Sequence, residues 1–312
     1  MNRYKRMFLK LLSYPHRNLK KYYKVYRKIL TAVNFYFRPM YKLMDHKIMV
    51  GDREIPVRIF APPKNKASGI LIFFHGGGWV TGNIDSYTNV CANMAKQTKC
   101  SVISVDYRLA PEYPFPSGLE DCYHAVEEIF RNLDLLHYKA EDITLIGDSA
   151  GGNLAAAVSL LARDRGEFLP GRQILIYPAT YNDHTEKSPF PSVHENGKGY
   201  LLTAKRIQEY MDLYAPKEED RLSPYLAPLL AEDLSNQPDT LIITAEFDPL
   251  RDEGEAYGIR LKEFGNHVKM HRMKDAVHGF FSRPWESEYV VRSYEIINWF
   301  LSCCKDKSEE LI

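Results

Sequence analysis

Residues 143–163 most strongly constrain the fold, because they read as a strand, a sharp turn and a helix with a serine at the turn. The apolar run Ile143–Ile146 predicts a short buried strand, and Asn153–Arg163 predicts a helix. Between them, Gly147-Asp-Ser-Ala-Gly151 places Ser149 between glycines, which tolerate the close backbone approach of such a turn. This is the nucleophile elbow pattern, in which the serine hydroxyl projects from a strand end with a helix N-terminus behind it. The pattern predicts an α/β fold with a candidate nucleophile at Ser149.

A glycine loop follows another apolar run further upstream. Leu71–Phe74 predicts a buried strand, and His75-Gly-Gly-Gly-Trp79 comes directly after it. Three glycines at a strand end leave backbone N–H groups uncovered, and such donors stabilise an oxyanion by roughly 3–4 kcal/mol each in acyl-transfer enzymes. A flexible loop is the simpler interpretation of this stretch alone, but its pairing with the Ser149 turn favours an oxyanion site. We expect His75 to have a structural role in this loop.

Candidates for an acid and a base follow Ser149 along the chain, each just past a predicted strand. Asp248 lies beyond the apolar run Thr240–Thr244, and His278 lies beyond the strand-like run Val268–Met273. Catalytic groups gather at the carboxyl ends of parallel strands, so both side chains are expected near Ser149. A serine hydroxyl needs an imidazole to accept its proton, and the imidazole needs a carboxylate to orient it.

Asp252 is the main rival to Asp248 as the acid. It falls about one turn into a helix expected from Leu250, where a carboxylate caps the helix or pairs with a cation. Asp148 and Glu246 flank candidate site residues and are expected to make structural hydrogen bonds. Asp248, which stays in the loop after its strand, is therefore the preferred acid.

Five motifs in register resemble the hormone-sensitive-lipase-type esterases, which are α/β-hydrolases of the acetyl-esterase kind. Nucleophile, then acid, then base is also the order along the chain in α/β-hydrolases. The resemblance covers roughly residues 50–300, whereas the first 45 residues and residues 180–222 match no pattern residue by residue. The motifs are His75–Trp79, Tyr107–Pro116, Gly147–Asn153, Asp248–Asp252 and His278–Phe280.

The resemblance implies an α/β-hydrolase fold, with a mostly parallel central sheet flanked by helices and a helical cap. It implies hydrolysis of short-acyl carboxylic esters, acetyl to roughly hexanoyl, through an acyl-enzyme intermediate that requires no cofactor. It also assigns six site residues by position. These are Ser149 as nucleophile, Asp248 as orienting acid, His278 as base, and Gly76, Gly77 and Ala150 as donors of the oxyanion hole.

Two other functions stay open on the sequence. Ester and amide hydrolysis use the same three side chains, so an amidase or deacetylase acting on N-acyl substrates shares this pattern. A ligand-binding receptor on a hydrolase scaffold is the second alternative, although that function usually accompanies loss of a triad residue. The preferred partner is a small-molecule ester.

The alternation of strand-like and helix-like runs predicts one α/β core interrupted by cap segments. Thr203 is a plausible N-cap for a helix that runs to Tyr214 inside the second cap segment. The expected boundaries are 1–46 for N-terminal cap helices, 47–179 and 223–312 for the core, and 180–222 for the cap insertion.

The charge of the chain is concentrated at its N-terminal end. Residues 1–47 contain 13 Lys or Arg and one acidic residue, a net charge of +12, whereas the remainder carries −11. A basic segment with interleaved aromatics can contact an anionic membrane surface or bind nucleic acid. A helical cap over the active site is the preferred interpretation. Membrane-surface contact stays open, and no nucleic-acid partner is expected.

Composition and cysteine content are typical of an ordinary globular protein. Of 312 residues, 45% are hydrophobic and 26% are charged. The five cysteines form no CxxC pattern and are odd in number, which suits a reducing cytosol and predicts a cytoplasmic location. No spacing resembles a zinc site and no stretch approaches the ~20 apolar residues of a membrane span, so neither is expected. A homodimer stays open.

Overall fold

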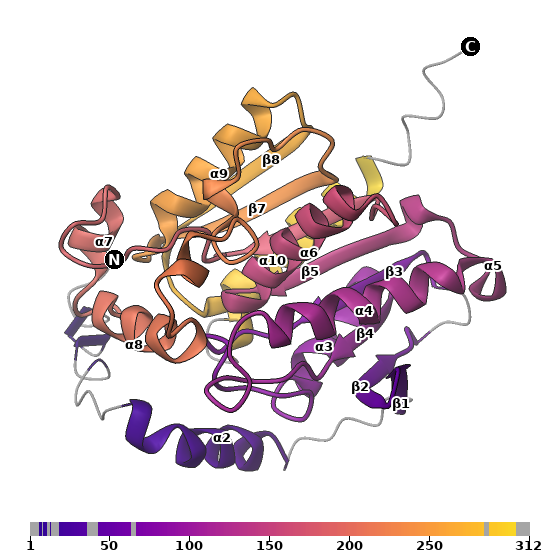
Figure 1. Ribbon diagram of the computed structural model, residues 1–312, viewed down its shortest axis with the longest axis horizontal. Helices are drawn as coiled ribbons and strands as arrows, with labels where there is room; N and C mark the ends of the chain where they lie inside the picture. Colours follow the sequence, from indigo (N-terminus) through magenta and orange to yellow (C-terminus); the bar gives the residue numbers. More distant parts are fainter. Residues whose placement is uncertain are drawn as a thin grey trace.

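The computed structural model describes residues 6–7, 9–10, 13, 19–35, 43–63, 67–283 and 287–303. Within these ranges the chain forms an eight-stranded sheet with the order β1-β2-β4-β3-β5-β6-β7-β8 (Figure 1). β2 pairs antiparallel with β1 and β4, and the other neighbours are parallel, which confirms the predicted mostly parallel sheet. The strands are β1 (Leu43–Val50), β2 (Arg53–Phe60), β3 (Ile70–Phe74), β4 (Ser101–Val105), β5 (Ile143–Asp148), β6 (Arg172–Ile176), β7 (Asp239–Phe247) and β8 (Val268–Val277).

Helices cover both faces of this sheet (Figure 1). α3 and α10 pack on one face, and α4, α6 and α9 pack on the other. The helix α6, which follows the serine turn, lies over the centre of the sheet and contacts β3, β5 and β6. The α-helices of the described part are α2 (Leu19–Phe35), α3 (Thr88–Thr98), α4 (Ser117–Arg131), α5 (Leu133–Leu136), α6 (Ala150–Arg165), α7 (Pro191–Asn196), α8 (Ala204–Tyr214), α9 (Arg251–Glu263) and α10 (Ser287–Cys303).

Strand β3 is apolar throughout because its side chains pack into the hydrophobic cores on both faces of the sheet. Ile70, Ile72 and Phe74 belong to the core that includes α4 and α6, whereas Leu71 and Phe73 belong to the core that includes α3 and α10. All five side chains are buried. Because successive side chains of a strand point to opposite faces, a central strand with helices on both sides is apolar throughout.

The N-terminal hairpin begins earlier than the sequence indicates. β1 starts at Leu43, inside the segment 1–46 that the sequence assigns to the cap, and it pairs with β2 along its whole length. Asp45 lies opposite Arg58 of β2, with Oδ1 and Nε 2.6 Å apart, and Arg58 also contacts Asp85. This edge strand is mostly exposed and is aligned by ionic contacts, so a hydrophobic pattern does not reveal where it starts.

Two elements outside the sheet, α2 and α8, lie far apart in the sequence but are neighbours in space (Figure 1). Lys20 Nζ of α2 lies 3.5 Å from Asp212 Oδ2 of α8. The predicted cap of α8 is confirmed, because the Thr203 side chain accepts a hydrogen bond from the Arg206 N–H at 3.2 Å. Much of the predicted segment 1–46 lies outside the described residues, namely 1–5, 8, 11–12, 14–18 and 36–42.

Candidate active site

Ser149 occupies a strained turn between β5 and α6. Its φ is 57° and its ψ is −117°, a conformation that residues with a side chain rarely adopt. The Ser149 N–H donates to the Ile176 carbonyl at 2.8 Å, which holds the turn against β6. A Cβ at Gly151 would lie 1.9 Å from the Phe74 carbonyl oxygen, so only glycine fits there. The turn therefore has the geometry of a nucleophile elbow.

The structure brings Ser149, His278 and Asp248 into one chain of hydrogen bonds. His278 Nε2 lies 2.9 Å from Ser149 Oγ, and His278 Nδ1 lies 2.7 Å from Asp248 Oδ2. Asp248 is fully buried, and its second oxygen accepts from the Leu250 N–H at 2.9 Å. The His278 ring packs against the Tyr177 ring, with centroids 4.7 Å apart. These contacts fix the imidazole between a hydroxyl and a carboxylate.

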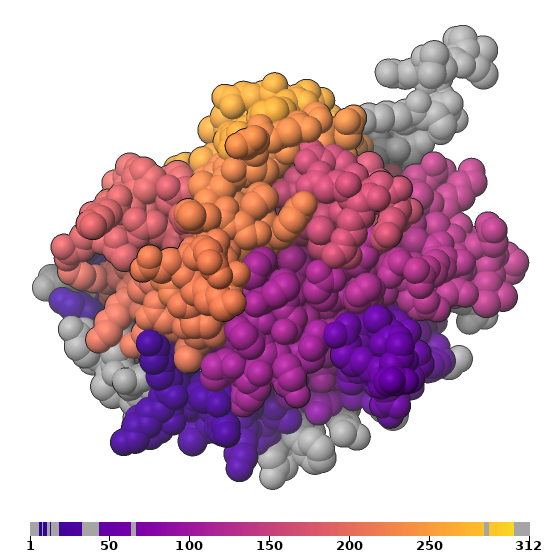
Figure 2. All heavy atoms as spheres, viewed as in Figure 1, coloured from indigo at the N-terminus to yellow at the C-terminus, as the bar shows by residue number. Residues whose placement is uncertain are grey.

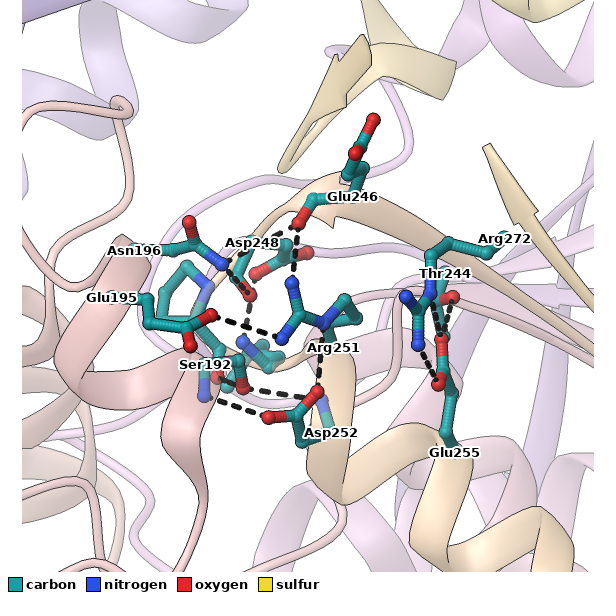
Figure 3. A network of polar contacts seen from close by, with 12 residues as sticks. Ser192, Glu195, Asn196, Thr244, Glu246, Asp248, Arg251, Asp252, Glu255 and Arg272 are labelled. Atoms are coloured by element: carbon teal, nitrogen blue, oxygen red, sulfur yellow. Dashed lines mark hydrogen bonds and ion pairs between the residues drawn. The ribbon is translucent and has the colours of Figure 1, made fainter. Parts of the chain in front are cut away.

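Helix α7, from the segment 180–222, holds the loop that carries Asp248 (Figure 3). Ser192 Oγ donates to the Pro249 carbonyl at 2.8 Å. Asn196 Nδ2 lies 3.4 Å from the Asp248 carbonyl oxygen and from the Glu246 carbonyl oxygen. The insertion thus fixes the backbone on both sides of the carboxylate.

The rival Asp252 bonds to Ser192 and Arg251 in this same network (Figure 3). Its Oδ2 accepts from the Ser192 N–H at 2.7 Å, and its Oδ1 lies 2.7 Å from Arg251 Nε. These contacts lower the pKa of Asp252 against the opposing effect of burial. Of the two roles predicted for Asp252, capping the helix or pairing with a cation, the contact with Arg251 confirms the second.

One predicted oxyanion donor is wrong. The N–H of Gly76 donates to Asp148 Oδ1 at 2.8 Å, so this amide is not free to bind an oxyanion. Asp148 is buried and also accepts from the hydroxyls of Tyr87 at 3.1 Å and Tyr177 at 3.3 Å. Asp148 therefore anchors the start of the glycine loop beside Ser149, in the structural role that the sequence predicts for it.

The neighbouring amides are better placed to bind an oxyanion. Gly77, Gly78 and Ala150 line the same pocket as Ser149 and His278, whereas Gly76 does not. Within the described part of the chain, no group accepts a hydrogen bond from the N–H of Gly77, Gly78 or Ala150. Ala150 is the first residue of α6, where the partial positive charge of the helix N-terminus also favours an anion.

We expect Asp148→Asn to remove a pH-dependent part of the stability. Burial raises the pKa of Asp148 from 3.8 to about 6. The folded state therefore binds the proton of the Asp148 carboxyl more tightly than the unfolded state does. The stability that this proton contributes is present below pH ~4 and is lost as pH rises through about 6. Relative to wild type, the free energy of unfolding of the variant should rise by roughly 2.5 kcal/mol between pH 4 and pH 7. Urea unfolding at both pH values measures this, and a constant difference would contradict it.

His75 has the structural role that the sequence predicts. It is fully buried, its Nδ1 lies 2.8 Å from the Gly76 carbonyl oxygen, and its ring stacks on Tyr107 with centroids 4.3 Å apart. Burial lowers the pKa of His75 to about 4, so the ring is neutral at neutral pH. It fixes the backbone of the glycine loop and does not contact Ser149.

A pocket of about 420 Å³ opens above Ser149 and His278. Its lining is mostly apolar and includes residues from both segments that the sequence assigns to a cap. The side chains from these segments include Leu19, Tyr26, Ile29, Leu30, Leu202 and Ile207. An apolar pocket with a few polar groups at its base is the usual form of a small-molecule site.

The residues that hold the loops of the site were not predicted from the sequence. Ser192 and Asn196 belong to no motif, because their contacts arise only when the insertion packs on the core. Asp148 carried a usable signal, since a carboxylate at the end of a buried strand needs dedicated donors. That signal predicted structural hydrogen bonds for Asp148 but not that Gly76 would be one of the donors.

A mostly parallel sheet covered by helices on both faces, with a strained serine turn after a central strand, defines an α/β-hydrolase. Residues 71–282 match the family described as alpha/beta hydrolase fold, and the chain belongs to this family. The predicted fold and family are therefore confirmed.

Similar proteins carry esterase names. The chain is 41% identical over 254 residues to an arylesterase of Saccharolobus solfataricus, a match that covers 81% of each chain. It is 36% identical over 230 residues to an ethyl acetate hydrolase of Pseudomonas putida, covering 72% of this chain and 71% of the relative. A solved esterase from Pyrobaculum calidifontis matches with a TM-score of 0.86 and 34% identity, covering 98% of this chain and 99% of that one.

Proposed function

We propose that this protein is a serine carboxylesterase that hydrolyses short-acyl esters through an acyl-enzyme intermediate. Its class, carboxylic ester hydrolase, follows from the family and from the named relatives. The observation that carries the finer proposal is the chain of contacts from Asp248 through His278 to Ser149, at the base of an apolar pocket.

In the first half-reaction, Ser149 Oγ attacks the ester carbonyl carbon while His278 Nε2 accepts the hydroxyl proton. Asp248 accepts a hydrogen bond from the His278 Nδ1–H and stabilises the imidazolium that forms. The carbonyl oxygen becomes an oxyanion, and the amides of Gly77, Gly78 and Ala150 are the donors that we assign to it. The imidazolium then gives its proton to the leaving alkoxide, so the alcohol departs and an ester of Ser149 remains.

In the second half-reaction, water takes the place of the alcohol. His278 accepts a proton from the water as its oxygen attacks the acyl carbon, and the same amides stabilise the second oxyanion. Collapse of this intermediate breaks the bond to Ser149 Oγ, which recovers a proton from His278. The carboxylic acid is released and the enzyme returns to its starting state without any cofactor.

We assign substrate selection to a two-part cap formed by the N-terminal segment and the segment 180–222. Both contribute apolar side chains to the pocket, and the second also holds the Asp248 loop through α7. We place the start of the core at Leu43, where β1 begins, and not at residue 47. A pocket of about 420 Å³ suits a short acyl chain together with a small alcohol group.

A panel of p-nitrophenyl esters from acetate to palmitate tests this function. We expect kcat/KM to be highest between acetate and hexanoate and to fall for longer chains, because the pocket is too small to bury them. The matched anilide of the best acyl group should react far more slowly, because an amine is a poorer leaving group. A preference for palmitate would contradict the short-acyl assignment, and a faster anilide would make the protein an amidase or deacetylase.

A further inference from the structure

The inner face of α2 is fixed to the core by hydrogen bonds. Arg27 donates to the carbonyl oxygens of Val80 at 2.7 Å and Ala110 at 2.8 Å, and its Nη2 lies 3.0 Å from a carboxylate oxygen of Glu112. The Tyr23 hydroxyl donates to the same carboxylate at 3.1 Å. These bonds determine which face of the helix points away from the molecule.

The outward face of α2 combines cations with apolar side chains. Lys21, Lys24 and Lys28 are exposed, and the adjacent Val25 and Ile29 are 50% and 53% exposed. The spacing i, i+3, i+4, i+7 and i+8 puts all five on one side of a helix. α2 contains no acidic residue, and its solvent side lies at the lower edge of the molecule in Figure 2. We call these five residues the α2 outer face.

This face adjoins the entrance to the candidate active site. Ile29 lines the pocket that contains Ser149, and so do Tyr26 and Leu30 of the same helix. A molecule bound at the α2 outer face is therefore beside the opening through which an ester reaches Ser149. Within the described residues, no helix is long and apolar enough to span a membrane.

We propose that the α2 outer face docks this protein on an anionic lipid surface, from which ester substrates enter the pocket. Entry of ester substrates from the lipid surface rests on the proposed esterase function, whereas docking on that surface does not. A basic amphipathic helix binds such surfaces because lysines attract anionic headgroups while apolar side chains enter the boundary with the acyl chains. Nucleic acid is the weaker candidate, because phosphate contacts use the lysines but give no reason to expose Val25 and Ile29 among them.

Co-sedimentation of the full chain with vesicles tests the docking step. Wild type should pellet with vesicles containing phosphatidylserine at low salt, pellet less as salt rises, and stay in solution with phosphatidylcholine alone. The triple variant Lys21→Gln, Lys24→Gln, Lys28→Gln should lose most of this binding, and Val25→Ser should weaken it. A matched control replaces three exposed lysines elsewhere, Lys96, Lys262 and Lys269, with glutamine and should pellet like wild type.

Hydrolysis of soluble p-nitrophenyl acetate by each variant separates docking from catalysis. The triple variant should keep the wild-type rate, which also shows that it is folded. The proposal is overturned if wild type does not prefer the anionic vesicles, or if the control variant loses as much binding as the triple variant. It is also overturned if a DNA duplex binds Lys21, Lys24 and Lys28 more strongly than the vesicles do and so removes the protein from them. Anionic-vesicle binding without esterase activity would reject the proposed function and leave the docking surface in place.

Discussion

Ser149→Ala should lower kcat on the order of 10⁶-fold, because no other hydroxyl lies at the hydrogen-bonding position of His278 Nε2 within the described residues. The substitution removes one oxygen atom and leaves the backbone at φ 57° in place, so we expect the fold to persist. Hydrolysis of p-nitrophenyl acetate measures kcat, and thermal unfolding of both proteins verifies the fold. A variant that unfolds like wild type and retains more than a trace of its activity would contradict the assignment of Ser149.

Asp248→Asn should have the next largest effect, a fall in kcat of about 10⁴-fold. An amide can donate a hydrogen bond to His278 Nδ1, which stabilises the tautomer that cannot accept a proton from Ser149. The amide also carries no charge to stabilise the imidazolium. KM should change much less than kcat, because Asp248 is fully buried and has no access to the substrate.

Asp252→Asn is the matched control for this prediction. Both carboxylates come from the same loop and helix start, but Asp252 contacts Ser192 and Arg251 and not His278. We expect a small loss of activity from Asp252→Asn, through slight loosening of the loop. Equal losses of kcat from the two variants would mean that the loop tolerates no change at all, and the orienting role of Asp248 would lose its support.

The three side chains of the proposed triad could be expected near one another from the sequence, because strand ends in a parallel sheet share one edge. Ser149, Asp248 and His278 each follow a run predicted as a strand, and these runs form β5, β7 and β8. The choice of Asp248 over Asp252 also followed from local chemistry, since only Asp248 stays outside the helix α9.

Contacts between segments that are distant in the sequence were harder to predict. Gly76 and Gly77 are equivalent in a glycine run, and only the approach of Asp148 shows that one amide is already bonded. The hydrogen bond from Ser192 to the Pro249 carbonyl, beside Asp248, likewise depends on how the segment 180–222 packs on the core. A motif records which residue types are present, whereas a hydrogen-bond partner requires the folded arrangement of two loops.

The cap shows the same division between local and distant information. Thr203 was correctly predicted to cap α8, because an N-cap depends on bonds within a few residues. By contrast, the link from Arg27 to the carbonyls of Val80 and Ala110 has no local signature. The charge excess of the N-terminal segment was visible in the sequence, but which lysines face outward became clear only from the orientation of α2.

The most direct test of the central claim is to find where the acyl group resides during turnover. Wild type is mixed with p-nitrophenyl acetate, quenched in acid and digested, and the acetylated peptide is identified by mass spectrometry. We predict acetyl on Ser149 in wild type and no acetylated peptide in Ser149→Ala. An acetyl group on another residue in wild type, with turnover intact in Ser149→Ala, would contradict the account.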